Sequence, residues 1–127
     1  MKLIVTGGRD YSDQTTLDAV LNRIHQGFDP IRVLVHGGAN GADAMAGAWA
    51  ARRNIPVVEF RARWKLLGGI AGPARNQQML EGNLDATLLV FPGGSGTEDC
   101  WKRAHRLGLR MMFAEDVAKG LKNDQRV

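Results

Sequence analysis

The chain has 127 residues, enough for one domain with one hydrophobic core, and its 44% hydrophobic and 24% charged residues are ordinary for a soluble globular protein. No apolar stretch approaches the ~20 residues of a membrane-spanning helix, and the single cysteine excludes an internal disulfide, so we predict a cytoplasmic protein with no membrane partner. The net charge of +4 at pH 7 favours an anionic partner.

Strands and helices alternate along the sequence. Apolar, β-branched runs predict strands at residues 2–6, 31–36, 55–60 and 86–91, with 110–113 as a candidate fifth strand. Apolar residues at helical spacing predict helices at residues 13–24, 41–54, 73–81, 96–107 and 115–121, with an irregular segment at 61–73 and a polar tail from about residue 122. This alternation predicts a single α/β domain over residues 1–127. We expect a Rossmann-like doubly wound sandwich, whose mostly parallel sheet of about five strands has helices on both faces.

Three of the predicted strands run into turns that are rich in glycine. The first turn (residues 7–10) reads GGRD, the second (residues 37–43) reads GGANGAD, and the third (residues 92–97) reads PGGSGT. A strand that stops in such a turn and restarts as a helix leaves backbone N–H groups at the positive end of the helix dipole, which favours an anion, usually a phosphate. Because doubly wound sheets bind ligands beyond the carboxyl ends of their strands, we expect all three turns at one edge.

The turns supply most of the predicted ligand-binding residues, which are Gly7, Gly8, Arg9, Gly37, Gly38, Gly41, Asp43, Pro92, Gly93, Gly94, Ser95, Gly96 and Thr97. None of the turns is a Walker loop or a strict G-x-G-x-x-G dinucleotide motif. One glycine turn is usually structural, but two complete strand–glycine–helix units favour a ligand site. No spacing of His, Cys, Asp and Glu resembles a zinc site, and we predict neither a metal nor a cofactor.

Several side chains outside the glycines are candidates for the same site. Arg75, near the start of a predicted helix, either holds a phosphate or carboxylate by two hydrogen bonds or lies exposed. Asn76 pairs either with a ligand hydroxyl or with its own loop. Trp64 lies in a glycine-flanked loop and is the best candidate for stacking on a base, whereas Trp49 fits a buried anchor.

Three carboxylates follow the second and third turns. Asp43, Glu98 and Asp99 each lie in the first turn of a predicted helix, where the helix dipole favours a carboxylate for structural reasons. In a ligand site, the same groups bind a ribose hydroxyl or activate water against an anomeric carbon. Their spacing favours the structural interpretation, and the second stays open.

The motifs GGRDY, HGGANGADAMAGAWA, AGPARNQQML and FPGGSGTEDCWKRA, with the segment around Trp64, together resemble the SLOG superfamily, and most closely its YspA-like branch of small stand-alone domains. The resemblance covers residues 2–113 and implies a Rossmann-like fold that binds nucleotides or nucleotide-derived ligands. In the related LOG phosphoribohydrolases, a P-G-G-x-G-T-x-x-E motif holds the phosphate, and its glutamate and an upstream arginine cleave the N-glycosidic bond of a nucleoside monophosphate. Here residues 92–97 match the motif and Arg75 resembles the arginine, but Cys100 occupies the glutamate position, with Glu98 and Asp99 one or two places earlier.

The resemblance implies a nucleotide-like small molecule as the ligand. If the protein is an enzyme, we expect hydrolysis of an N-glycosidic or phosphoribosyl bond, with Arg75, Glu98 and Asp99 as catalytic residues. The alternatives are a non-catalytic nucleotide sensor and a module for single-stranded nucleic acid, which the superfamily's DNA-processing protein A binds. The nucleic-acid alternative would use the basic residues Arg52, Arg53, Arg61, Arg63, Lys65, Lys102, Arg103 and Arg106. The alanine-rich helix at 41–54 fits either a homodimer contact or packing on its own sheet.

Overall fold

The structure, a computed structural model, describes residues 1–125, with side chains described for residues 1–121. Its centre is a five-stranded parallel sheet in the order β3-β2-β1-β4-β5. The strands are β1 (Lys2–Thr6), β2 (Val33–His36), β3 (Val57–Glu59), β4 (Thr87–Val90) and β5 (Arg110–Phe113). This architecture confirms the predicted Rossmann-like α/β fold, and it includes the candidate fifth strand.

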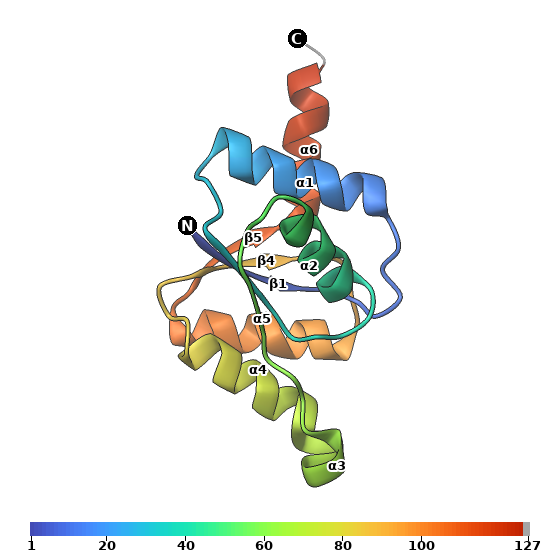
Figure 1. Cartoon of the computed structure of the whole chain (residues 1–127), viewed down its shortest axis with the longest axis vertical. Coiled ribbons are helices and arrows are strands. Elements are labelled where there is room, and N and C mark those ends of the chain that lie inside the picture. The colour runs from blue at the N-terminus through green and yellow to red at the C-terminus, as the bar shows by residue number, and fades with distance from the viewer. Residues whose placement is uncertain (126–127) are drawn as a thin grey trace.

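Helices cover both faces of the sheet (Figure 1). On one face lie α1 (Gln14–Gly27), α2 (Ala42–Arg52) and α6 (Ala114–Gln125), and on the other lie α4 (Ala71–Glu81) and α5 (Ser95–Leu107). Two short elements, α3 (Trp64–Leu67) and the 3-10 turn η1 (Gly68–Ile70), project beyond these layers at one end of the molecule. Residues 1–125 contain no helix with the length and apolarity that a membrane crossing requires.

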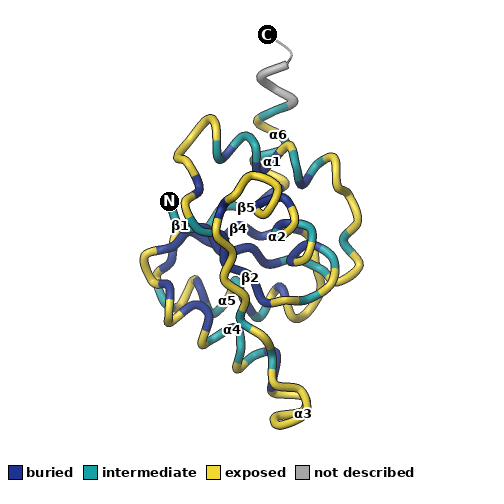
Figure 2. Tube along the Cα trace, viewed as in Figure 1, coloured by how far each residue is buried: buried dark blue, intermediate teal, exposed yellow. Residues whose placement is uncertain are grey.

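The core is divided by the sheet into two apolar clusters. Successive residues of β1 serve opposite clusters: Leu3 and Val5 pack with α1 and α2, whereas Ile4 packs with α4 and α5. A strand buried on both faces needs continuous apolarity rather than alternation, which explains its sequence. Figure 2 shows the central strands as the most buried part of the trace. At the sheet edge, β3 is short and exposed on all three residues.

Segment 61–73 differs from its prediction as an irregular loop. It contains α3, η1 and the first residues of α4, so Pro73 is the third residue of that helix and not the first. The first turn of a helix tolerates proline because its N–H groups have no intrahelical acceptor. No residue of α3 or η1 is buried, and this explains why their helical turns left no apolar periodicity in the sequence.

Candidate functional site

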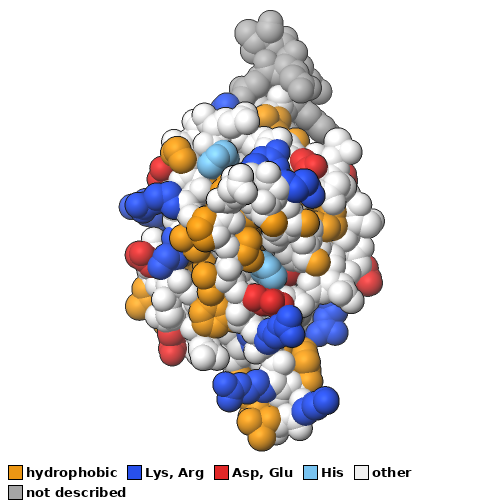
Figure 3. All heavy atoms as spheres, in the orientation of Figure 1, with side chains coloured by type: hydrophobic (Ala, Val, Ile, Leu, Met, Phe, Trp, Pro, Cys, Tyr) orange, Lys and Arg blue, Asp and Glu red, His pale blue; other side chains and the backbone are white. Residues whose placement is uncertain are grey.

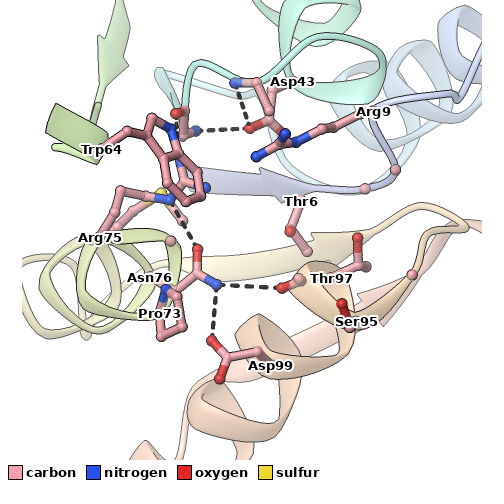
Figure 4. A pocket seen from close by; sticks show the side chains of 18 of the residues that line it. Thr6, Arg9, Asp43, Trp64, Pro73, Arg75, Asn76, Ser95, Thr97 and Asp99 are labelled. Atoms are coloured by element: carbon pink, nitrogen blue, oxygen red, sulfur yellow. Dashed lines mark hydrogen bonds between the residues drawn. The ribbon is translucent and has the colours of Figure 1, made fainter. Parts of the chain in front are cut away.

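A cavity of about 630 Å³, here called the main cavity, opens at the carboxyl edge of the sheet (Figure 4). It lies where the central strand β1 stands between β2 and β4, the point from which the chain connections run in opposite directions. All three glycine turns reach its wall, together with α3, η1 and the start of α4. The lining residues are Thr6, Gly7, Gly8, Arg9, Gly37, Ala39, Asp43, Trp64, Gly69, Gly72, Pro73, Arg75, Asn76, Met79, Gly94, Ser95, Gly96, Thr97 and Asp99.

The third glycine turn presents open backbone amides to the main cavity. Gly94 precedes α5 and makes no side-chain capping hydrogen bond, and its carbonyl accepts from Glu98 N–H at 3.0 Å. A Cβ atom added at Gly94 or Gly96 would meet nothing within 4 Å. The first N–H groups of α5 have no intrahelical acceptor and lie at the positive end of the helix dipole, and residues 94–97 line the main cavity, which suits an anion.

The second glycine turn has its amides occupied by the protein itself. Oδ2 of Asp43 accepts hydrogen bonds from Gly37 N–H at 3.1 Å and Ala39 N–H at 3.3 Å. Gly41 has a φ of +76° and packs closely against the first turn, so that an added Cβ would lie only 2.2 Å from Gly8 O. The second turn thus resembles the third in sequence, but its amides are not available to bind an anion.

The first turn braces the other two. Gly8 N–H donates to Pro92 O at 2.9 Å, and Gly8 O accepts from Ala42 N–H at 3.2 Å. An added Cβ at Gly7 would lie 2.5 Å from the Cβ of Ala42 and 2.8 Å from that of Phe91. The glycines at 7 and 8 therefore permit close packing of three loops around the cavity.

Asp43 is the most electrostatically perturbed group at the site. It is 5% exposed, and its Oδ1 is buried without a hydrogen-bond partner among the described residues. Burial raises the pKa of Asp43 to about 6, although the hydrogen bonds from Ala39 and Gly37 and the charge of Arg75 oppose that rise. Burial also lowers the pKa of the neighbouring His36, whose Nδ1 accepts from Gly38 N–H at 2.9 Å.

Arg75 is fixed between the turns by its own chain. Its Nη1 donates to the carbonyls of Gly37 and Phe60, the latter at 3.3 Å, and its Nε donates to Asn76 Oδ1 at 3.0 Å. A side chain at Gly37 would collide with this guanidinium. The arginine therefore joins the ends of β2 and β3 to α4 and carries a positive charge at the cavity wall.

Asn76 and Asp99 continue this network to α5. Asn76 is 5% exposed, and its Nδ2 donates to Asp99 Oδ2 at 3.0 Å and to Gly96 O at 3.3 Å. Asp99 also accepts from Nε of Arg103 at 2.9 Å. Burial raises the pKa of Asp99, but the hydrogen bonds from Arg103 and Asn76 outweigh burial, so the pKa lies below its ordinary 3.8. Asp99 is therefore held in its ionised form by groups from both α4 and α5.

Glu98 and Cys100 lie away from the main cavity. Glu98 faces a neighbouring hollow that also holds Trp101, and it pairs with Lys102 at 2.6 Å. Cys100, at the position of the LOG glutamate, is fully buried on the core side of α5, and burial raises the pKa of its thiol to about 11. The expected catalytic set of Arg75, Glu98 and Asp99 is thus not brought together as free groups.

Trp64 and Arg9 form an exposed pair on the cavity wall. Trp64 is 47% exposed, and the Arg9 guanidinium lies 5.3 Å from the centroid of its ring. Trp49, by contrast, is fully buried. Several lining residues were not predicted from the sequence. Gly72 and Pro73 could have been proposed for the site, because they come just before Arg75. Met79 could not, because its position in a predicted helix indicates nothing about the cavity.

Some predicted residues line other surfaces. Pro92 and Gly93 lie with Glu98 in the hollow beside β5, whereas Gly38 lines a cavity between β2 and β3. The predicted basic residues are also divided. Arg52 and Arg53 lie at the far end of α2, where Arg52 pairs with Asp18 at 3.7 Å. Among the residues with described side chains, no group of His, Cys, Asp and Glu is arranged to hold a metal ion.

Comparison of the chain with known proteins identifies its family. A model of the YspA, cpYpsA-related SLOG family matches residues 1–66, which carry the first two turns. The chain is similar to a protein named "Gene 61 protein" from Mycobacterium phage D29, with 36% identity over an alignment of 116 positions that covers 85% of this chain and 91% of the relative. No solved structure matches the chain significantly. The chain belongs to the YspA, cpYpsA-related SLOG family, which confirms the resemblance seen in its motifs.

Proposed function

We propose that this protein binds a nucleotide or a nucleotide-derived small molecule in the main cavity, with a phosphate group on the amides at the start of α5. Membership of the SLOG family indicates nucleotide-related binding or processing as the class of function. The observation that carries the proposal is the uncapped N-terminus of α5 at the wall of a cavity at the sheet's switch point.

The rest of the cavity supports the same ligand class. The half-exposed ring of Trp64 offers a flat apolar surface for a base, and such stacking contributes ~1–3 kcal/mol per base. Arg9 and the fixed guanidinium of Arg75 give the wall positive charge for an anionic ligand. Between these surfaces and the amides of α5 there is room for a sugar.

We propose binding without turnover as the function that the contacts favour. Hydrolysis of an N-glycosidic bond needs a free carboxylate near the sugar. Asp99 is held by Arg103 and Asn76, and Glu98 pairs with Lys102 outside the cavity. Asp43 is 5% exposed and holds the second turn through its Oδ2. Arg75 uses Nε and Nη1 on Asn76 and on backbone carbonyls. Incubation with AMP, ADP-ribose and NAD should release no base, as followed by chromatography.

Ser95 provides the test of the phosphate seat. It is exposed in the first position of α5 and lines the main cavity. Ser95→Asp places a carboxylate at the amides, which stabilises the helix by ~0.3–1 kcal/mol but repels a phosphate. Like charges ~4 Å apart cost ~1–4 kcal/mol in partly solvated surroundings, so AMP affinity measured by calorimetry should fall about tenfold or more.

Ser95→Asn is the matched control, because it has nearly the same shape without the charge. We expect it to keep AMP affinity close to that of the unmodified protein. If Ser95→Asp and Ser95→Asn bind AMP equally, or if no nucleotide binds the unmodified protein, the proposed phosphate seat is wrong.

A further inference from the structure

A second cavity of about 390 Å³, here called the side cavity, adjoins the main one between the ends of β2 and β3. The two cavities share the Arg9–Trp64 pair, Gly37, Ala39 and Arg75. The side cavity alone adds Gly38, Asn40, Glu59, Arg61 and Ala62. The two cavities therefore adjoin along this shared wall, and a ligand that spans both would pass the Arg9–Trp64 pair.

The side cavity is positively charged. Its walls carry the three arginines Arg9, Arg61 and Arg75 against one acid, Glu59, which leaves two positive charges in excess. Glu59 lies 3.3 Å from Nε of Arg61, and the Arg61 side chain is 82% exposed, so its guanidinium can turn to a ligand with little loss of contact. Figure 3 shows Lys and Arg side chains gathered over this part of the molecule, beside α3. Arginine recognises phosphate oxygens by paired hydrogen bonds.

Two glycines shape this charge distribution. At Gly37 the missing side chain leaves room for the Arg75 guanidinium, which stands at the boundary of both cavities. At Gly38, with φ of +75°, an added Cβ would lie 2.2 Å from Oε1 of Glu59. The second turn, which offers no amides of its own, thus serves to place charged side chains between β2 and β3.

The distance between the two positive sites limits the ligand. The open amides follow β4, whereas the side cavity follows β2 and β3, and β1 lies between them in the sheet. Neighbouring strands lie ~4.8 Å apart, so β4 and β2 are separated by ~10 Å. Two phosphates that share a bridging oxygen are too close together to occupy both sites. Two phosphates on the 3′ and 5′ oxygens of one ribose are farther apart and better matched, because arginine side chains span the remaining gap.

We propose that the site takes a small nucleotide with one phosphate on each of two different hydroxyls of its ribose, the first phosphate on the amides of α5 and the second at Arg61 and Arg75 in the side cavity. This inference rests on the proposed function, since it assigns the second end of the ligand in the same site. Trp64, which lines both cavities, would then contact the base.

The test compares AMP, ADP and adenosine 3′,5′-bisphosphate by calorimetry on the full chain. We expect the bisphosphate to bind about tenfold more tightly than AMP, as a charge-assisted arginine contact would give, and ADP to gain much less. In Arg61→Gln, most of this preference for the bisphosphate should disappear. Arg52→Gln is the matched control, because it removes the same charge from another surface ion pair at the far end of α2, and it should keep the preference.

Each other result overturns the inference. A phosphate site in the side cavity is ruled out if AMP and the bisphosphate bind equally, or if Arg61→Gln keeps the full preference for the bisphosphate. In either case, AMP binding would still support the proposed function. An equal loss in Arg52→Gln would show that only net charge matters. Affinity that rises with oligonucleotide length and falls steeply with salt would identify a single-stranded nucleic acid instead. If none of the nucleotides binds, the proposed function and this inference are both wrong.

Discussion

Asp43 is a nearly buried carboxylate with only one of its oxygens hydrogen-bonded. Its Oδ2 holds the second glycine turn closed, and that turn packs against the first turn at the cavity wall. The groups that face it come from several elements, with Arg75 on α4 favouring the ionised form and Glu59 on β3 opposing it. Because this carboxylate is buried, its ionised form lowers the stability of the folded protein.

The pH dependence of stability should reveal this group. Because the folded pKa of Asp43, about 6, lies above its ordinary 3.8, folding favours the protonated form. Its stabilising contribution is present below about pH 4 and is lost as the pH rises through 6. A shift of about two pKa units corresponds to ~3 kcal/mol in the free energy of unfolding.

Asp43→Asn isolates this effect, because its amide oxygen can still accept from Gly37 and Ala39 while it does not titrate. We expect urea unfolding to show that the unmodified protein loses up to ~3 kcal/mol relative to Asp43→Asn between pH 4 and pH 7. A difference between the two proteins that stays constant over this range would contradict the raised pKa.

At the residue scale, the sequence predicted which side chains would approach the site but not what they would do there. Arg75 and Trp64 both line the main cavity, as their positions suggested. Of the two partners of Asp99, Arg103 lies four residues further along α5, a spacing that favours an ion pair, whereas Asn76 reaches Asp99 from α4 and could not be predicted. Hydrogen-bond partners across a packed interface leave no pattern in the spacing along one chain.

At the element scale, the second and third turns show how similar sequences take different roles. Both follow a buried strand and lead into a helix, but Asp43 accepts from the amides of the second turn, whereas no described side chain caps the helix after the third. The position of the acid explains the difference. Asp43 is the second residue of α2 and reaches back to its own turn, whereas Glu98 and Asp99 come later in α5 and point to Lys102 and Arg103.

Substitutions at two helical glycines test whether the N-terminus of α5 binds the phosphate. Gly96 and Gly120 both lie within helices and have free space where a Cβ would go, but only Gly96 lines the main cavity. Gly96→Ala should raise the free energy of unfolding by up to ~1 kcal/mol, since alanine favours the helix. The added methyl group should nevertheless weaken AMP binding severalfold, because it projects into the proposed phosphate seat.

Gly120→Ala is the control, since it makes the same chemical change in α6, away from the cavity. Calorimetry should find its AMP affinity unchanged. Equal AMP affinity in Gly96→Ala and the unmodified protein would mean that the ligand's phosphate lies elsewhere, whatever the change in stability.

At the scale of the whole molecule, strand and helix alternation was enough to predict the fold. The continuous apolar runs of β1, β2 and β4 indicated a sheet covered on both faces, and the all-parallel order confirms it. The projecting α3 and η1 could not be predicted in the same way. Their residues pack on neither apolar cluster, so burial never imposed a helical pattern on their sequence.

The shared sheet also bears on the prediction of a single domain. Leu3 and Ile4 are neighbours in β1 but belong to opposite core clusters, and β1 pairs with both β2 and β4. Neither cluster can lose its packing without disturbing the strand that supports the other. We therefore expect residues 1–127 to unfold in one cooperative transition, as small single domains do.

This cooperativity can be measured with two probes that report on different parts of the molecule. Trp49 is fully buried in the cluster beneath α1 and α2, and replacing Trp64 and Trp101 by phenylalanine leaves it as the only tryptophan. Its fluorescence and the far-ultraviolet circular dichroism of all the helices should give the same urea midpoint. Separate midpoints would show that the two sides of the sheet unfold independently. The packing around Trp49 would then be lost at a different urea concentration from the helices on the other face.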